Sequence, residues 1–165
     1  ASLIEAGVGV GGRRIVVLGA GGAARAVIDA LGREGAAEVV VVNRTASRAA
    51  EAAALTGVGR VGSIADVADA DIVVNATSIG MGTTELPLDP RLLRAGEVVA
   101  DLVYHPSETA LLAAARAAGC TVVDGLGMLV HQAVLQQELW TGRRPDPAVI
   151  RAAADAELAR RAANR

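Results

Sequence analysis

The small residues of a glycine-rich turn near the start of the chain are the ones best placed to hold a ligand. The turn follows the apolar run Ile15–Leu18, precedes a helical pattern, and reads Gly19-Ala20-Gly21-Gly22-Ala23-Ala24. Gly19 would let the chain turn tightly, Gly21 would let the backbone approach a pyrophosphate, and Ala24 would let the helix pack closely on the strand. Because the first N–H groups of such a helix suit phosphates, the pattern predicts a dinucleotide site; a purely structural turn is the alternative.

The end of the second apolar run, Val39–Val42, indicates which dinucleotide would bind. An NAD site usually carries Asp or Glu there, whereas this chain has Asn43 followed by Arg44. Thr45 could cap the next helix, and Arg44 and Arg48 would then lie unfavourably near its positive end. A bound 2′-phosphate would reverse that balance, because guanidinium groups bind phosphate bidentately. We therefore expect NADP; two solvated surface arginines are the alternative.

Polar residues also follow two later apolar runs. Asn75 and Thr77 come after Ile72–Val74 and could hold a ribose or the nicotinamide amide, although a glycine-containing turn would explain them equally simply. Asp101 and Tyr104 leave the next run at the same expected edge of the sheet, where ligands bind in open α/β folds. An aspartate that caps the following turn and a tyrosine that covers apolar surface are the plain alternative for that pair.

The helical pattern over residues 126–140 is apolar on two faces, and one of them carries Gln132. An amide on an apolar face is unusual for a helix that packs on one side only. This helix could therefore lie between its own sheet and a second body, with Gln132 bound to a polar ligand. A buried structural glutamine is the alternative.

No catalytic group and no metal site are expected within the chain. All 16 basic residues are arginines, so no lysine can act as a general acid or base. His105 and His131 have no serine or cysteine nucleophile in a recognisable motif beside them, and no Cys/His cluster has metal-ligand spacing.

The elements that must position these residues alternate between strands and helices. The expected strands are Ile15–Leu18, Val39–Val42, Arg60–Gly62, Ile72–Val74, Val98–Asp101 and Thr121–Val123. The expected helices are Ala23–Arg33, Ser47–Leu55, Ile64–Ala68, Ser107–Ala117, Leu126–Trp140 and Pro147–Ala163, the last with Asp146 as its N-cap. This order predicts an α/β, Rossmann-like, doubly wound and mostly parallel six-stranded sheet with helices on both faces and two carboxy-terminal helices.

Length and composition narrow the class of protein. The 165 residues favour one domain, and a net charge of −2 gives no support for nucleic acid or an anionic membrane as a partner. Cys120 is expected to be a buried core thiol in a reducing compartment, since it cannot form an internal disulfide. With no signal peptide and no membrane-spanning stretch recognisable, we expect a cytoplasmic protein.

Taken together, these segments resemble the NADP-binding domain of the shikimate dehydrogenase family. The matching segments are Gly19–Ala23, Asn43-Arg44-Thr45-Ala46-Ser47-Arg48, Asn75-Ala76-Thr77-Ser78-Ile79-Gly80-Met81, Asp101-Leu102-Val103-Tyr104-His105-Pro106 and Asp124-Gly125-Leu126-Gly127-Met128-Leu129-Val130-His131-Gln132. They run in family order and cover nearly the whole chain. The reaction of the family is the reversible, NADPH-dependent reduction of 3-dehydroshikimate to shikimate in aromatic amino-acid biosynthesis.

The resemblance implies a role for each segment. The residues that would hold the pyrophosphate are Gly19, Ala20, Gly21, Gly22 and Ala23, and those that would hold the adenosine ribose phosphate are Asn43, Arg44, Thr45 and Arg48. Leu102 and Gly125 would line the nicotinamide site, and Met128, Asn75 and Thr77 are also expected to bind the cofactor, while Tyr104 and Gln132 would reach the substrate.

The chain departs from the family in one large respect. Family members carry an amino-terminal domain that supplies most substrate contacts and a catalytic Lys–Asp pair. We therefore expect 1–165 to be a cofactor domain, in which 1–12 is a remnant of the inter-domain helix and link and 126–163 face the missing domain. Alone it should bind NADP without turnover, and a homodimer is left open. The alternatives are a free-standing NADP-binding or sensing module, an NAD-dependent quinate/shikimate dehydrogenase, and a methyltransferase.

Overall fold

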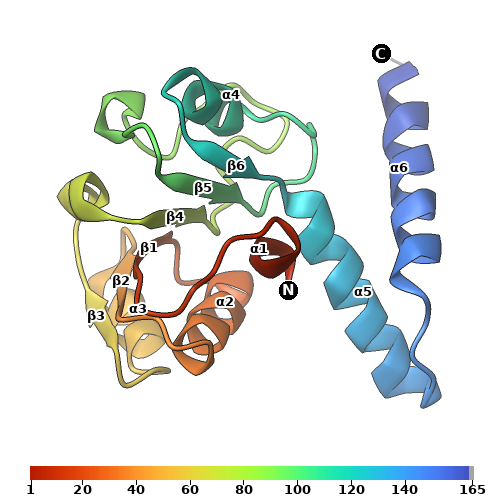
Figure 1. The fold of residues 1–165 in the computed structure, drawn as a ribbon, viewed down its shortest axis with the longest axis horizontal. Coiled ribbons are helices and arrows are strands. Elements are labelled where there is room, and N and C mark those ends of the chain that lie inside the picture. Colours follow the sequence, from red (N-terminus) through yellow and green to blue (C-terminus); the bar gives the residue numbers. More distant parts are fainter. Residues whose placement is uncertain (164–165) are drawn as a thin grey trace.

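The sheet of the computed structural model, which describes residues 1–163, is parallel throughout (Figure 1). Its strands are β1 (Arg14–Leu18), β2 (Glu38–Val42), β3 (Gly59–Val61), β4 (Ile72–Asn75), β5 (Val98–Asp101) and β6 (Thr121–Val123). They lie in the order β3-β2-β1-β4-β5-β6, so the direction of winding reverses between β1 and β4. In this register Leu18 lies between Val42 and Asn75, which places the ends of β1, β2 and β4 at one edge. The predicted doubly wound sheet is confirmed.

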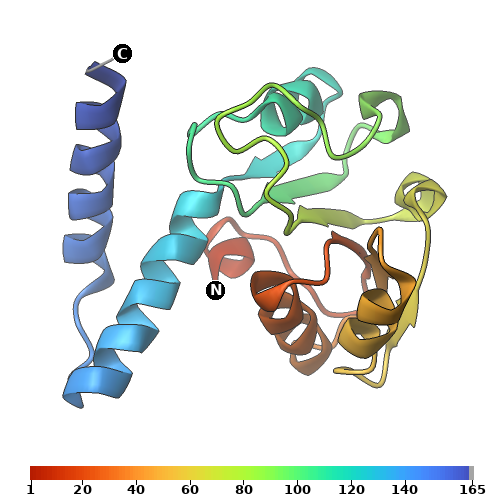
Figure 2. The ribbon, with the colours of Figure 1, turned by 180° about the vertical axis from the view of Figure 1, so that it is seen from behind.

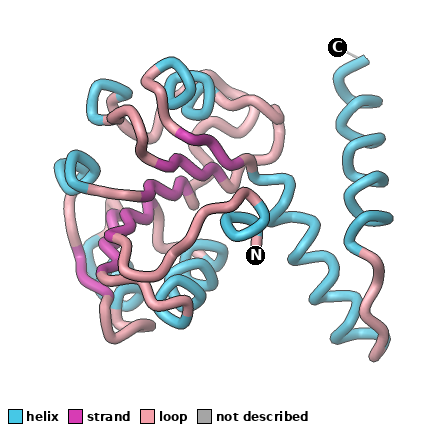
Figure 3. Tube along the Cα trace, viewed as in Figure 1, coloured by secondary structure: helices cyan, strands magenta, loops and turns pink. Residues whose placement is uncertain are grey.

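Figure 3 shows how helices alternate with these strands along the chain. The helices are α1 (Ser2–Glu5), α2 (Gly22–Arg33), α3 (Ala46–Ala53), η1 (Ile64–Asp69), η2 (Pro90–Leu92), α4 (Ala110–Ala117), α5 (Gly125–Thr141) and α6 (Pro147–Ala163). Two expectations were wrong in detail. Ile64–Asp69 is a 3₁₀ helix, and α4 starts at Ala110 rather than Ser107 because the Thr109 hydroxyl accepts a hydrogen bond from Leu112 N (3.2 Å) and caps the helix.

The strands are apolar on both sides because both faces of the sheet are covered. Ile15 and Val17 belong to a core with α2 and α3, while Val16 and Leu18 belong to a second core with η1 and α4. Cys120 is a correction: it is half-buried rather than buried, because it lies in the turn before β6, where it packs against the edge of the second core with its thiol 3.3 Å from the Arg94 carbonyl oxygen.

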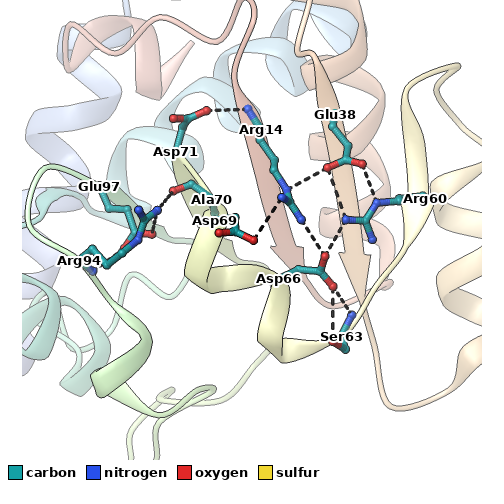
Figure 4. A network of polar contacts seen from close by, with 10 residues as sticks. All are labelled: Arg14, Glu38, Arg60, Ser63, Asp66, Asp69, Ala70, Asp71, Arg94 and Glu97. Carbon is teal, nitrogen blue, oxygen red and sulfur yellow. Dashed lines mark hydrogen bonds and ion pairs between the residues drawn. The ribbon is translucent and has the colours of Figure 1, made fainter.

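An ion-pair cluster ties together the amino ends of the first strands, opposite the edge where β1, β2 and β4 end (Figure 4). Arg14 lies 2.9 Å from a Glu38 carboxylate oxygen and 2.8 Å from one of Asp66, and Arg60 lies 2.6 Å from each of the same two acids. The bond from Arg60, followed by the bond from the Ser63 backbone N–H, lowers the pKa of Asp66 to about 2. The cluster is structural, and it was not predicted from the sequence.

The last two helices form a hairpin that extends away from the sheet (Figures 1 and 2). Asp124 precedes α5 and accepts a hydrogen bond from Leu126 N (3.0 Å), and Asp146 precedes α6 and accepts one from Ala148 N (2.9 Å), the cap that was predicted. One face of α5 is buried, yet Leu139 and Trp140 are 84% and 77% exposed. None of the helices within residues 1–163 is long and apolar enough to span a membrane.

Candidate functional site

A groove of about 380 Å³ opens at the edge where the strands end. It lies at the point where the winding of the sheet reverses, between the ends of β1, β2 and β4. Its lining includes residues from three predicted segments: Gly19, Asn43 and Arg44, and Thr77. Open α/β sheets bind their ligands in this position, because the crossovers diverge there and leave a crevice.

Within the glycine-rich turn, glycine is present at positions 19 and 21 for different physical reasons. Gly19 has a φ of +111°, and a Cβ there would lie 2.9 Å from the Ala76 carbonyl oxygen, so the fold itself requires glycine. Gly21 has an ordinary φ of −78°, and a Cβ there would meet nothing within 4 Å. The protein does not need glycine at position 21 for its own packing. The open space in front of Gly21 and Gly22 is where a ligand could approach the start of α2, which has no side-chain cap.

The segment after β2 exposes two cations at the start of α3. Asn43 folds back onto its own turn, with Nδ2 donating to the Thr45 carbonyl oxygen (3.0 Å). Thr45 is the N-cap of α3, as expected, but its side chain makes no capping hydrogen bond. Arg44 and Arg48 are exposed, and in the described part of the chain no carboxylate lies within ion-pair distance of either. These donors are therefore available to an anion.

A buried polar network lies behind the groove, where β4 and β5 end. Asn75 Nδ2 donates to Asp101 Oδ1 (2.9 Å) and to the Ile79 carbonyl oxygen (3.2 Å), and its Oδ1 accepts from Thr77 N (3.1 Å) and Oγ1 (2.7 Å). The same Asp101 oxygen accepts from Val103 N (3.0 Å), so Asp101 does cap the turn after β5. Asn75 is fully buried, and its side-chain amide bonds to Asp101, Ile79 and Thr77; its contact with the cofactor stays a prediction.

The residues expected near the nicotinamide lie where β5 ends and α5 begins. A Cβ at Gly125 would lie 2.6 Å from the Leu102 carbonyl oxygen, so only glycine lets α5 start this close to the segment after β5. Leu102 and Met128 line a mostly apolar cavity of about 160 Å³ between α1, α2 and the sheet. Tyr104 is half-buried and Gln132 is exposed, so the alternative of a buried structural glutamine is wrong.

Two features of this edge were not predicted from the sequence: the hydrogen bond of Thr109 to Asp101 and the raised pKa of Asp101. Thr109 is buried, and its hydroxyl donates to Asp101 Oδ2 (2.7 Å), yet it was expected to lie inside a helix. Burial raises the pKa of Asp101, although three hydrogen bonds to the carboxylate oppose that shift. Within residues 1–163 no cluster of His, Cys, Asp or Glu could hold a metal ion.

Comparison with known proteins identifies relatives of this chain by family models and by sequence. The model of the shikimate/quinate 5-dehydrogenase family matches residues 3–82, and that of the shikimate 5′-dehydrogenase C-terminal domain matches residues 125–154. The shikimate dehydrogenase (NADP+) of Moorella thermoacetica is 47% identical over 162 residues, which cover 90% of this chain and 55% of that protein.

Solved structures agree with these sequence matches. The shikimate 5-dehydrogenase of Thermus thermophilus, in complex with NADP(H) and shikimate, superposes with a TM-score of 0.83 at 40% identity, covering 98% of this chain and 59% of that one. The quinate dehydrogenase of Corynebacterium glutamicum, in complex with NAD, has a TM-score of 0.79 at 38% identity, with coverages of 85% and 54%. The chain thus spans little more than half the length of these relatives. Its fold, its motifs and both family models show that this chain belongs to the shikimate dehydrogenase family.

Proposed function

We propose that the chain is the NADP(H)-binding part of a shikimate dehydrogenase. The observation that carries the proposal is the pairing of an open glycine at the start of α2 with two arginines at the start of α3 that no carboxylate neutralises within residues 1–163. The backbone around Gly21 would hold the pyrophosphate, and Arg44 and Arg48 would hold the 2′-phosphate. The naming of the Moorella relative for NADP+ supports the same nucleotide.

The chain's own residues suit binding and orientation better than proton transfer. Bound NADPH would supply the hydride that reduces a keto acid such as 3-dehydroshikimate. Leu102, Gly125 and Met128 would form the wall for the nicotinamide ring, and Tyr104 and Gln132 would reach the substrate from the segments after β5 and within α5. In the described residues neither of these two polar side chains makes a hydrogen bond, so both are available to a substrate. The chain contains no lysine that could serve as a proton donor.

We further propose that a second domain, such as the relatives have the length to carry, packs on the helical hairpin. The stretch 126–163 would face it, and 1–12 would be the link to it. The hairpin leaves Leu135 (54%), Leu139 (84%) and Trp140 (77%) exposed, and apolar side chains grouped in this way commonly mark an interaction surface. Such a domain would supply the catalytic groups and close over the substrate, so the chain alone should not turn over.

A site-resolved titration tests the binding proposal. NADPH added to isotopically labelled chain should shift the backbone amide signals of Gly21, Gly22 and Ala23 and the side-chain signals of Arg44 and Arg48. Signals of Arg14 and Arg60, in the ion-pair cluster at the far edge, are the internal control and should not move. Shifts confined to another surface, or equal shifts with S-adenosylmethionine, would contradict the proposal.

A kinetic assay tests the second part. With NADP and shikimate, the chain should form NADPH, followed by its absorbance, no faster than the uncatalysed reaction does. The proposed catalytic groups lie in the second domain, and a positioned proton donor alone contributes roughly 10²–10⁴-fold to the rate. Turnover close to that of a complete dehydrogenase would show that the catalytic group lies within these residues. Faster reaction with quinate and NAD would instead favour the NAD-dependent alternative.

A further inference from the structure

The carboxylate of Asp101 is an unusual group to find behind a binding groove. It is 1% exposed, and no cation lies within ion-pair distance of it in the described chain. A buried unpaired charge is costly, and a well-packed apolar side chain at the end of a strand would stabilise the fold more simply. The reason for an aspartate here must therefore be found in what it holds.

The carboxylate joins three segments that are far apart in the sequence. Oδ1 accepts from Asn75 Nδ2 at the end of β4 (2.9 Å) and from Val103 N just after β5 (3.0 Å). Oδ2 accepts from the Thr109 hydroxyl at the N-cap of α4 (2.7 Å). These three donors arrange the exits of two neighbouring strands and the start of a helix around one side chain.

The network continues toward the glycine-rich turn. Asn75 holds Thr77 through both its backbone N–H and its hydroxyl, and the Thr77 hydroxyl accepts in turn from Ile79 N (3.1 Å). Ala76 and Thr77 lie against Gly19 so closely that a Cβ there would be 2.9 Å from the Ala76 oxygen. The network thus reaches the segment that packs against Gly19 at the start of the turn, while the turn's later residues Gly21 and Gly22 have no such contact.

The network also fixes the segment after β5. Leu102 N donates to the Asn75 carbonyl oxygen (2.9 Å), and Gly125 packs so closely that a Cβ there would lie 2.6 Å from the Leu102 carbonyl oxygen. Tyr104 thus lies between two buried anchors that both bind Asp101: Val103, which is 1% exposed, and Thr109, also 1% exposed. The backbone that carries Leu102 and Tyr104 has little freedom as long as the carboxylate is in place.

We infer that Asp101 is a positioning residue, which holds the segments 76–79 and 102–104 in the shape that the nicotinamide half of the cofactor requires. This inference rests on the proposed function for the location of that half. Asp101 acts through the backbone and through Asn75 and Thr109, and it need not touch the cofactor. The adenosine half, held by the glycine-rich turn and Arg44, lies on the other side of β1 and should be much less sensitive to it.

Comparing the affinities of two ligands distinguishes a positioning role of Asp101 from a general loss of stability. NADPH needs both halves of the groove, whereas adenosine 2′,5′-bisphosphate needs only the adenosine half. Thr109→Val removes the hydroxyl donor at nearly constant volume, and Thr109→Ser keeps it. Asp66→Ala, in the ion-pair cluster at the far edge, is the control that lowers stability without touching this network.

Calorimetry well below the unfolding temperature should give a selective loss. Thr109→Val should bind NADPH about tenfold more weakly and the bisphosphate within about twofold of the unsubstituted chain, because one partner of a buried network is removed. Thr109→Ser and Asp66→Ala should bind both ligands within about twofold. Equal losses for both ligands, or no loss for either, would overturn the inference.

A second measurement needs no ligand and covers the case in which Thr109→Val does not fold. Asp101→Asn keeps the size of the side chain and one carbonyl oxygen, but presents an amide nitrogen to Thr109. Amide hydrogen exchange at Val103 and Thr77 should accelerate about tenfold in this variant and remain unchanged at Val41, deep in β2. Uniform acceleration, or none, would overturn the positioning role. If the unsubstituted chain binds neither ligand, the proposed function fails, and this inference about the nicotinamide half fails with it.

Discussion

Gly21→Val tests whether glycine at position 21 is required for ligand binding rather than for folding. At this position φ is −78°, which valine accepts, and a Cβ would have no heavy atom within 4 Å. The free energy of unfolding should fall by no more than about 1 kcal/mol, because Gly21 is the N-cap of α2 and valine is a poorer N-cap than glycine. The reduced freedom of the unfolded valine chain offsets part of this cost.

Binding should respond very differently. The branched side chain would project into the space that a pyrophosphate must enter to reach the first N–H groups of α2. Hydrogen bonds to charged groups contribute about 1.5–3 kcal/mol each, so the loss of two corresponds to roughly 3–6 kcal/mol, or at least about a hundredfold in affinity.

Calorimetry with NADPH, together with thermal unfolding, measures both quantities on one sample. Gly57→Val is the matched control, because a Cβ at Gly57 also has nothing within 4 Å but lies in the turn before β3. Gly19→Ala provides the contrast: its φ of +111° and the 2.9 Å approach to Ala76 should destabilise the fold by about 1–3 kcal/mol. Normal NADPH affinity in Gly21→Val would refute the reasoning and leave the turn as a purely structural feature.

Three further predictions concern charge, pH and association. Arg44→Ala should weaken NADP binding by about 1.5–3 kcal/mol and leave NAD binding nearly unchanged in parallel calorimetric titrations, whereas equal losses would remove the 2′-phosphate role. The pKa of Asp66 is about 2 in the folded chain and 3.8 without its partners, so its stabilisation is complete above pH 3.8 and is lost as the pH falls toward 2; acid titrations of unfolding should show this loss, and Asp66→Ala should lack it. Leu135→Gln combined with Leu139→Gln should reduce self-association in sedimentation, and an unchanged mass distribution would show that the exposed face of α5 is not the contact.

The sheet could be predicted because its signal is local. Val39–Val42 is apolar at every position, which is typical of a strand covered on both faces, and helical patterns alternate with such runs. The parallel, doubly wound sheet followed from the right-handed crossovers that parallel strands need, whereas the order of the strands is known from the structure alone. The start of α4 was misplaced because Ser107 and Glu108 suit a helix by propensity, while the position of the cap is set by where the Thr109 hydroxyl lies.

The site could be predicted only in part. The positions of Gly19, Arg44 and Thr77 at one groove follow from their place after strand ends, and this signal is present in the sequence. The role of Asp101 is different, since its three donors come from Asn75, Val103 and Thr109, and only the tertiary structure brings them together. The ion-pair cluster of Arg14, Glu38 and Arg60 was missed for the same reason.

Titration of the chain with NADPH and with NADH under one set of conditions tests the central claim most directly. The two nucleotides differ only in the 2′-phosphate, and Arg44 at the groove and Arg48 in the first turn of α3 have no carboxylate partner in the described chain. NADPH should bind at least about tenfold more tightly than NADH, since one charge-assisted contact contributes 1.5–3 kcal/mol. Equal affinities, or tighter binding of NADH, would contradict the assignment of Arg44 and Arg48 to the 2′-phosphate and with it the proposed choice of cofactor.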